Sequence, residues 1–179
     1  MTSITTYTKK TFDPLVPDIE LIDIIDIAHA LSLLCRANGH FPEFYSVGIH
    51  SLNCMEEARA RGYSERVQFA CLLHDASEAY LSDITRPVKS ALPQYKEIET
   101  VLQNVIYTKW LGGALTEEEY RLMREVDDVM LYYEMLRYFG EKISGIAPKL
   151  YSKPVFCFNG FEKTERDFLE RFESLKKLI

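Results

Sequence analysis

Residues 74–78, with the sequence HDASE, directly follow the apolar run FACLL at 69–73. Such a run is typical of a buried helix. Ionisable side chains that continue it are costly to bury unless a metal ion or a proton relay compensates them. His50 upstream and Asp127 downstream also fall in helical patterns. Nitrogen and oxygen ligands that converge in this way inside a helical protein favour a metal site.

The rest of the chain is dominated by helical spacing of apolar residues. Ser46, Ser64 and Thr164 are placed to cap helices, and Thr116 with Glu119 can form a capping box. These signals predict helices at about 23–35, 46–61, 64–80, 92–111 and 116–139, and from 164 onward. The last should bury a face made of Phe168, Leu169, Phe172 and Leu175. A short β-like piece is expected at 154–158, so the fold class is all-α, a bundle of about six helices.

The length of 179 residues favours one domain with a substantial core. Residues 1–20, which include two prolines, are expected to form an arm that packs on the domain or on the rim of its site. Residues 21–179 should form the domain itself. The net charge of −6 gives no overall basic surface, so no nucleic-acid partner is expected. A small anionic substrate remains possible, because a few cations can gather in one cleft.

The four cysteines, Cys35, Cys54, Cys71 and Cys157, show no CxxC spacing and are interpreted as reduced, mostly core residues. No apolar run is long enough to span a bilayer, so no membrane partner is expected. The polar start of the chain does not look like a secretory signal. The sequence therefore predicts a cytoplasmic protein.

Mixed imidazole and carboxylate ligation suits Mn, Fe, Co, Ni or Zn better than Ca or Mg. His74 and Asp75 would leave one helix about 100° apart, so an ion would lie beside the helix. Glu78, at i+4 from His74, would share its face and could orient a metal-bound water or move its proton. Asp83, in the following loop, could contact a leaving-group oxygen or a sugar hydroxyl.

The same residues carry a family resemblance. The series His50, His74-Asp75 and Asp127 is similar to the four-ligand signature of HD-domain metal-dependent phosphohydrolases. HDASE, followed by Asp83 and the segment RPVK at 86–89, resembles the small single-domain branch of that superfamily. This branch includes bacterial 5'-deoxynucleotidases and phage and bacterial HD hydrolases. The resemblance covers roughly residues 20–140.

The resemblance implies an HD-type helical fold, one divalent metal ion and hydrolysis of a phosphoester in a small nucleotide, such as a (deoxy)nucleoside 5'-monophosphate. By motif position, the metal ligands would be His50, His74, Asp75 and Asp127. Glu78 and Asp83 would be catalytic. Arg36 would meet the phosphate, with Arg86 and Lys89 as further substrate-binding candidates. Ala37 stands where the characterised deoxynucleotidases carry a tryptophan that helps to recognise the sugar. Proteins of this size in the superfamily are often dimers, so a homodimer or higher homo-oligomer is expected.

Several alternatives stay open at this stage. His74 and Asp75 could be a buried ion pair, Glu78 an inert neighbour, Asp83 a loop cap and Arg36 an ordinary cation at a helix end. Asp128 competes with Asp127 as the late ligand. Two other functions compete with a nucleotidase. One is a dNTP triphosphohydrolase, which would need more basic residues along the phosphate track. The other is a metal-binding regulatory protein with little turnover.

Overall fold

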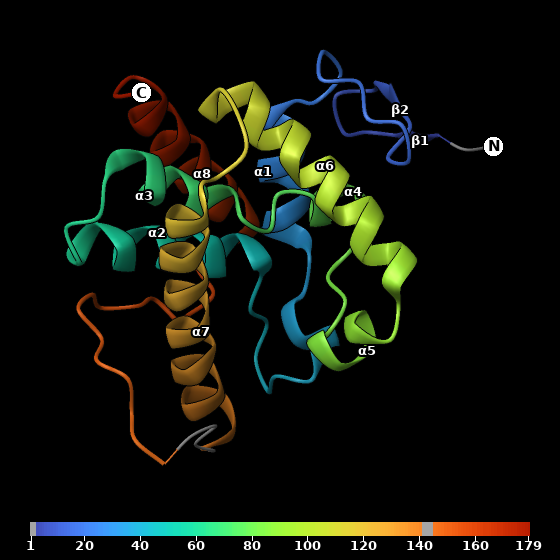
Figure 1. Cartoon of the computed structure of the whole chain (residues 1–179). Helices are drawn as coiled ribbons and strands as arrows, with labels where there is room; N and C mark the ends of the chain where they lie inside the picture. Colours follow the sequence, from blue (N-terminus) through green and yellow to red (C-terminus); the bar gives the residue numbers. More distant parts are fainter. Residues whose placement is uncertain (1–2, 141–144) are drawn as a thin grey trace.

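The computed structural model describes residues 3–140 and 145–179. Within these residues it contains eight α-helices, a 3₁₀ turn and a two-stranded hairpin (Figure 1). The helices are α1 (Ile24–Leu33), α2 (Val47–Ala60), α3 (Glu65–Leu73), α4 (Glu78–Leu81), α5 (Arg86–Ser90), α6 (Pro93–Leu111), α7 (Glu117–Phe139) and α8 (Phe161–Lys176). The 3₁₀ turn spans Arg36–Gly39, and the strands are β1 (Ile4–Thr5) and β2 (Thr11–Phe12). The predicted all-α single domain is confirmed, and its six expected helices correspond to the six long ones.

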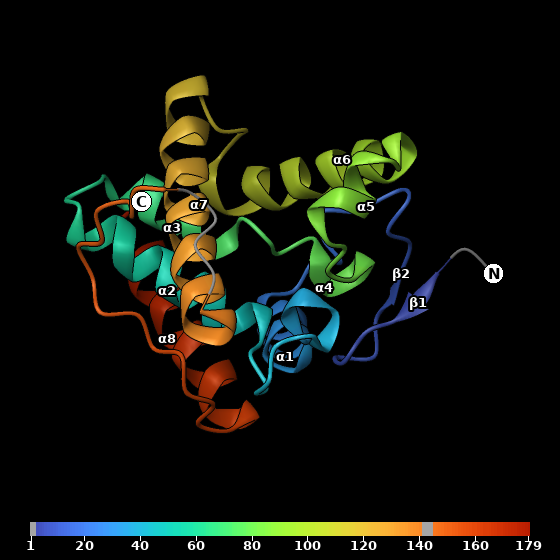
Figure 2. The same ribbon diagram turned by 90° about the horizontal axis from the view of Figure 1, so that it is seen from below.

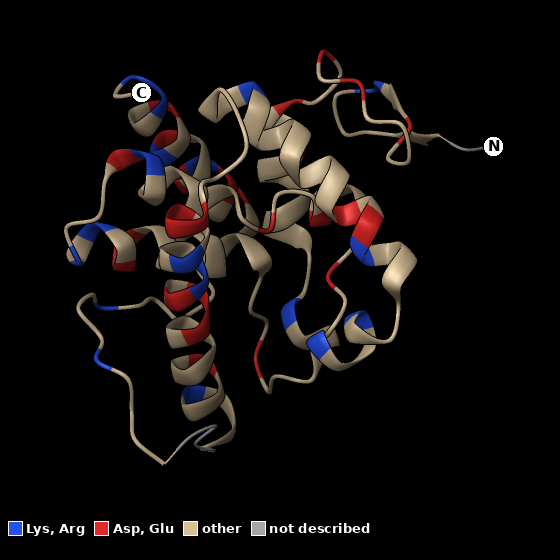
Figure 3. Cartoon of the chain, viewed as in Figure 1, with Lys and Arg blue, Asp and Glu red and all other residues tan. Residues whose placement is uncertain are grey.

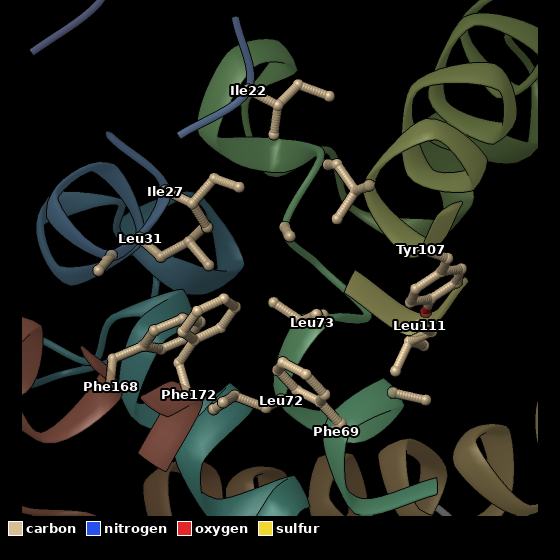
Figure 4. Close-up of a cluster of buried hydrophobic side chains, with 14 of the residues drawn as sticks. Ile22, Ile27, Leu31, Phe69, Leu72, Leu73, Tyr107, Leu111, Phe168 and Phe172 are labelled. Atoms are coloured by element: carbon tan, nitrogen blue, oxygen red, sulfur yellow. The ribbon is translucent and has the colours of Figure 1, made fainter. Parts of the chain in front are cut away.

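The centre of the fold is the pair α2 and α3, which pack against each other. The long helix α7 contacts both of them, while α1 and α8 pack together and against α2 (Figures 1 and 2). Helix α6 packs against α3. It diverges from α7 with distance from the loop that connects the two helices. The main core lies between α1, α3, α6 and α8 (Figure 4). Its fully buried members include Leu31, Phe69, Leu102, Phe168 and Phe172.

Three of the helices begin at the capping residues that the sequence predicts. The side chains of Ser46 and Ser64 accept hydrogen bonds at the starts of α2 and α3, and Thr116 with Glu119 forms the predicted capping box. The final helix differs, because it begins at Phe161 and not at a cap formed by Thr164. Gly160 occupies the cap position with a φ of 98°, which favours glycine, and the Thr164 hydroxyl donates to the Gly160 carbonyl. The buried face of α8 is otherwise as predicted, with Leu169 partly buried.

The first helix ends at Leu33, two residues before the predicted end at about residue 35. The chain at 34–36 is extended, because Arg36 N–H donates to the Tyr45 carbonyl and Val47 N–H donates to the Leu34 carbonyl. The turn Arg36–Gly39 follows as a separate element. Ala37 and Asn38 in this turn have left-handed backbone angles, with φ of 55° and 50°. Arg36 is therefore held by a tight turn and not by the end of a helix.

The predicted third helix, 64–80, is wrong in one respect, because it breaks after Leu73 and resumes as the short α4. His74 Nδ1 donates a hydrogen bond to the Cys71 carbonyl oxygen at 2.7 Å. The Gln103 side chain from α6 then donates to the Leu73 carbonyl at 2.7 Å and accepts from Ser77 N–H at 3.1 Å. These contacts satisfy backbone groups that a continuous helix would pair internally, so the break is stabilised from outside.

One peripheral segment also differs from expectation. Residues 154–158 form no strand, because the Asn53 side chain bonds both the N–H and the carbonyl of Val155 in place of a partner strand. The described part of the N-terminal arm contains the β1–β2 hairpin and contacts the domain. Phe12 is fully buried in the main core, and Thr8 bonds Asp26 of α1. No helix among the described residues combines the length and the apolar character that a bilayer crossing requires.

Candidate metal centre

Four side chains from three parts of the fold bring their ligand atoms together. His50 comes from α2, His74 and Asp75 from the end of α3, and Asp127 from α7. His50 Nε2 lies 3.2 Å from His74 Nε2, 3.3 Å from Asp127 Oδ1 and 3.8 Å from Asp75 Oδ2. His74 Nε2 lies 3.3 Å from Asp75 Oδ2 and 3.9 Å from Asp127 Oδ1. Ligands bound at about 2.1 Å to one ion are separated by about 3–4 Å, so the donor set fits a transition metal.

In their neutral forms, the two histidines direct the lone pairs of their Nε2 atoms at each other. His74 Nδ1 must donate, because its partner is the Cys71 carbonyl, and His50 Nδ1 faces a carboxylate oxygen of Glu134 at 2.6 Å. A neutral imidazole carries one N–H, so these partners assign both Nε2 atoms as acceptors. Acceptors at 3.2 Å repel each other unless positive charge lies between them. Burial and Arg36 oppose a charge on His50, but Cys54, Glu134 and Asp127 outweigh them and raise its pKa, so a proton on His50 Nε2 can supply this positive charge as a metal ion can. The position therefore attracts a cation.

Glu134 is a functional candidate that the sequence analysis missed. It is fully buried on α7 and accepts hydrogen bonds from His50 Nδ1, from Tyr45 Oη at 3.0 Å and from Arg36 Nε at 3.0 Å. Burial works against its ionisation, but Arg36 and His50 lower the pKa of Glu134 to about 2. A carboxylate behind a metal-binding histidine fixes its tautomer and orientation. The signal was present, because Glu134 lies seven residues, or two helical turns, after Asp127.

Asp127 and Asp128 have different surroundings. Asp127 is 5% exposed, and its Oδ1 faces the histidines. Its Oδ2 accepts from Arg86 at 2.8 Å and from Arg124 at 2.9 Å. The side chain of Asp128 is 55% exposed and pairs with the same two arginines outside the cluster. The geometry therefore brings Asp127, and not its neighbour, to the histidines. Figure 3 shows the acidic and basic residues interspersed along α7.

Cys54 lies one turn after His50 on α2 and is also close to the cluster. Its Sγ is 3.5 Å from His50 Nε2, and His50, Cys54 and His74 have ligand atoms within 4.8 Å of one another. These three residues alone could hold a metal ion. All four cysteines are free, as predicted, and burial raises the pKa of Cys54 to about 11. A thiol at this place would favour softer ions such as zinc over magnesium.

The predicted substrate-binding and catalytic residues lie around the cluster. Arg36 Nη1 is 3.4 Å from Asp75 Oδ2 and its Nη2 is 3.8 Å from Asp127 Oδ1. Asp83 accepts from Ala37 N–H at 3.3 Å, which ties the loop after α4 to the turn that holds Arg36. Lys89 of α5 bonds Glu78 Oε1 at 3.3 Å. All the predicted site residues except the buried His50 line one cavity of about 1000 Å³.

Glu78 has the chemistry of a proton-transfer group. It is 3% exposed, its Oε1 bonds Lys89, and its Oε2 has no hydrogen-bond partner among the described residues. Burial raises its pKa well above the ordinary value, and the charges of Asp75 and Asp83 add to this effect. A buried carboxyl group with a raised pKa that lines a cavity is suited to exchange a proton with a bound molecule.

Fold and site together define a class: a helical domain with a buried histidine–carboxylate centre that borders a cavity. No protein-family model matches the chain. It is 36% identical over 153 residues to a Rhodobacter capsulatus protein named Uncharacterized protein RCAP_rcc00048. The matched region covers 79% of this chain and 74% of that protein. The chain belongs to the same family as that protein.

A second relative is the Escherichia coli K12 protein named Uncharacterized protein YfdR. It is 38% identical over 112 residues, or 62% of this chain. The matched part spans 59% of the length of the Escherichia coli protein. Neither name states an activity, so the functional argument rests on the residues of the site.

Proposed function

We propose that this protein is an HD-type metal-dependent phosphohydrolase that acts on a small nucleotide, with nucleoside 5'-monophosphates as its substrates. One observation carries the proposal. Two histidine nitrogens lie 3.2 Å apart, and each has an oxygen of Asp75 and an oxygen of Asp127 within 4 Å, beside a cavity that also presents Glu78 and Arg36. The resemblance in sequence to the HD superfamily supports the same assignment. The proposed metal is one divalent ion of the group Mn, Fe, Co, Ni and Zn.

His50, His74, Asp75 and Asp127 would hold the ion. A divalent ion in such a site lowers the pKa of a bound water and polarises a phosphoryl oxygen. Glu78 would accept the proton that the attacking water loses. Arg36, now paired with carboxylates, would turn part of its guanidinium to the phosphate, and Lys89 would also stabilise charge. Asp83 would hold a hydroxyl of the leaving group.

The cavity supports a monophosphate over a triphosphate. Its cations are Arg36, Arg86, Lys89, Lys96 and Arg124. Arg86 and Arg124 are engaged by Asp127 and Asp128, and Lys89 is engaged by Glu78 and by Glu99 at 2.6 Å. A triphosphate adds about two further negative charges that would each need a partner. A regulatory metal-binding protein needs neither Glu78 nor Asp83, so their presence in the cavity favours an enzyme. We also propose action in the cytoplasm and a homo-oligomeric assembly.

The test is phosphate release from a panel of nucleoside mono-, di- and triphosphates, each with Mn, Co, Ni, Zn and Mg. The protein with His74→Ala serves as the control. Orthophosphate from monophosphates alone, absent with His74→Ala, is the expected result. Release of triphosphate from dNTPs would replace the proposal with the triphosphohydrolase. Absence of turnover with any pair, in protein shown to hold metal, would leave the regulatory role in its place.

A further inference from the structure

The cavity has two chemically different walls beyond the metal centre. On the α5 side it is cationic, with Arg86, Lys89 and Lys96. The other wall is formed by the end of α6, the connecting loop and the start of α7, and it carries a single charge, that of Glu117. Its residues are Asn104, Tyr107, Ala114, Leu115, Thr116, Glu117, Tyr120 and Met123. We call this second wall the α6–α7 compartment. Figures 1 and 2 show α6 and α7 diverging from the loop that joins them.

The α6–α7 compartment begins beside the proposed metal ligands. Met123 precedes Asp127 by four residues on α7 and therefore lies one turn away on the same face. Tyr120 is one further turn back, with 55% of its surface exposed. Aromatic and thioether side chains offer flat, polarisable surfaces that stack on heterocycles. Arg124, which follows Met123 and lines the same cavity, is engaged by Asp127 and Asp128, so the residues described for the compartment offer a phosphate no unpaired cation.

Tyr107 supplies an unsatisfied polar atom in this wall. The residue is 4% exposed, its ring packs in the main core (Figure 4), and its hydroxyl has no hydrogen-bond partner among the described residues. A ligand that reaches this hydroxyl would give it the partner it lacks. Burial, with Cys71 and Asp75 adding to it and the neighbouring Gln103 amide opposing it, raises the pKa of Tyr107, so the phenol stays neutral and can donate or accept.

We propose that the α6–α7 compartment binds the uncharged, flat heterocycle of a nucleoside phosphate, and that the Tyr107 hydroxyl is its polar contact. The inference rests on the proposed function, because it places the nucleoside next to a phosphate held at the metal centre. It adds what that function leaves open, namely which residues contact the base. Stacking on Tyr120 and Met123 and one neutral hydroxyl would accept several bases and discriminate weakly between them.

The test compares Tyr107→Phe with the matched control Tyr132→Phe. Tyr132 is also buried with an unpartnered hydroxyl, but it does not line the cavity. Calorimetry on manganese-loaded, full-length protein would measure binding of 2'-deoxyadenosine 5'-monophosphate and of the base-free 2-deoxyribose 5-phosphate. A Glu78→Gln background prevents turnover. Loss of one hydrogen bond should weaken nucleotide binding about three- to tenfold in Tyr107→Phe. Binding of the sugar phosphate should not change, and Tyr132→Phe should affect neither ligand.

A second variant tests the stacking surface independently. Tyr120 is exposed, so Tyr120→Ala should leave the fold intact and again weaken only the nucleotide. Equal nucleotide binding by the parent, Tyr107→Phe and Tyr120→Ala would overturn the compartment assignment while the proposed function stood. Equal weakening of both ligands would also overturn it, because the effect would then be on the phosphate or the sugar. If neither ligand bound the metal-loaded parent, the proposed function would fail and the compartment with it.

Discussion

Glu134 Oε1 lies 2.6 Å from His50 Nδ1, and both side chains are fully buried. The same carboxylate accepts hydrogen bonds from Arg36 Nε and Tyr45 Oη. One residue on α7 therefore orients the histidine of α2 and the arginine of the turn Arg36–Gly39. This contact couples the proposed metal ligand to the proposed phosphate ligand.

Glu134→Gln is expected to weaken metal binding about 10- to 100-fold, the usual effect of losing a carboxylate behind a ligating histidine. Equilibrium dialysis with Mn²⁺ or Co²⁺ would measure it. Glu125→Gln, on the exposed side of the same helix, is the control and should bind as the parent does. Unchanged affinity in Glu134→Gln would mean that His50 is oriented by other contacts.

Asp127 and Asp128 are adjacent in sequence, so the same substitution at each position compares the proposed metal ligand with its neighbour. Asp127→Asn should lose most bound metal, because an amide is a much weaker ligand than a carboxylate and its Oδ1 faces both histidines. Asp128→Asn should retain the metal, since the ion pairs of Asp128 among the described residues are with Arg86 and Arg124 and not with the histidines. Elemental analysis after dialysis distinguishes them. Metal loss in Asp128→Asn alone would reverse the ligand assignment.

Glu78→Gln should keep its metal and lose at least about 100-fold in turnover, as expected when a proton-transfer group is removed. The matched control is Glu99→Gln, because Glu99 bonds the same Lys89 but is not next to Asp75. Steady-state phosphate release, with metal content measured on the same samples, would check both variants. Similar losses in the two would indicate that the effect is on Lys89 and not on a proton transfer.

Glu57 predicts a pH dependence of stability away from the metal centre. It accepts from Tyr151 N–H, Ser152 N–H and Arg61 Nε. Burial raises its pKa, but the bonds from Ser152, Arg61 and Tyr151 outweigh this effect, and the pKa is lowered. A lowered pKa means that ionised Glu57 stabilises the fold fully above its unfolded value of about 4.3 and loses this effect as pH falls through the folded value.

Glu57→Gln should therefore lower the free energy of unfolding by about 2 kcal/mol at pH 7, the scale of hydrogen bonds to a charged group. The difference from the parent should shrink progressively below pH of about 4. Urea unfolding at several pH values would measure it, with Glu56→Gln on the exposed face as the control. A difference that stays constant with pH would show that the charge of Glu57 is not involved.

The sequence predicted the helices well wherever local signals decide the structure. The capping box of Thr116 begins α7 as expected. Gly112 and Gly140, both in the left-handed conformation, end α6 and α7 as expected. The break between α3 and α4 was not predictable, because the bonds that stabilise it come from Gln103, which lies 26 and 30 residues away in sequence. The early end of α1 likewise depends on backbone pairing with residues 45–47.

The candidate site was predicted in its residues but not in its supports. His74 and Asp75 stood out because they interrupt an apolar run. Glu134 did not, because a single glutamate on a long helix that begins EEEY looks like one more solvated charge. Its burial depends on Tyr45 and Arg36 packing around it, which only the tertiary structure shows. The break at His74 also means that Glu78 reaches the cavity from a separate helix and not from one continuous face.

The ligand atoms come from α2, from the end of α3 and from α7, so a bound ion would tie together three helices that are distant in the chain. No such arrangement exists in the unfolded chain, so metal affinity becomes resistance to unfolding. At free metal 100 times the dissociation constant, the gain is about 2.7 kcal/mol. A chelator should therefore lower the melting temperature of the parent and not that of Asp127→Asn. In a cell short of metal, the protein would open more often and be degraded sooner, so its abundance would follow the metal supply.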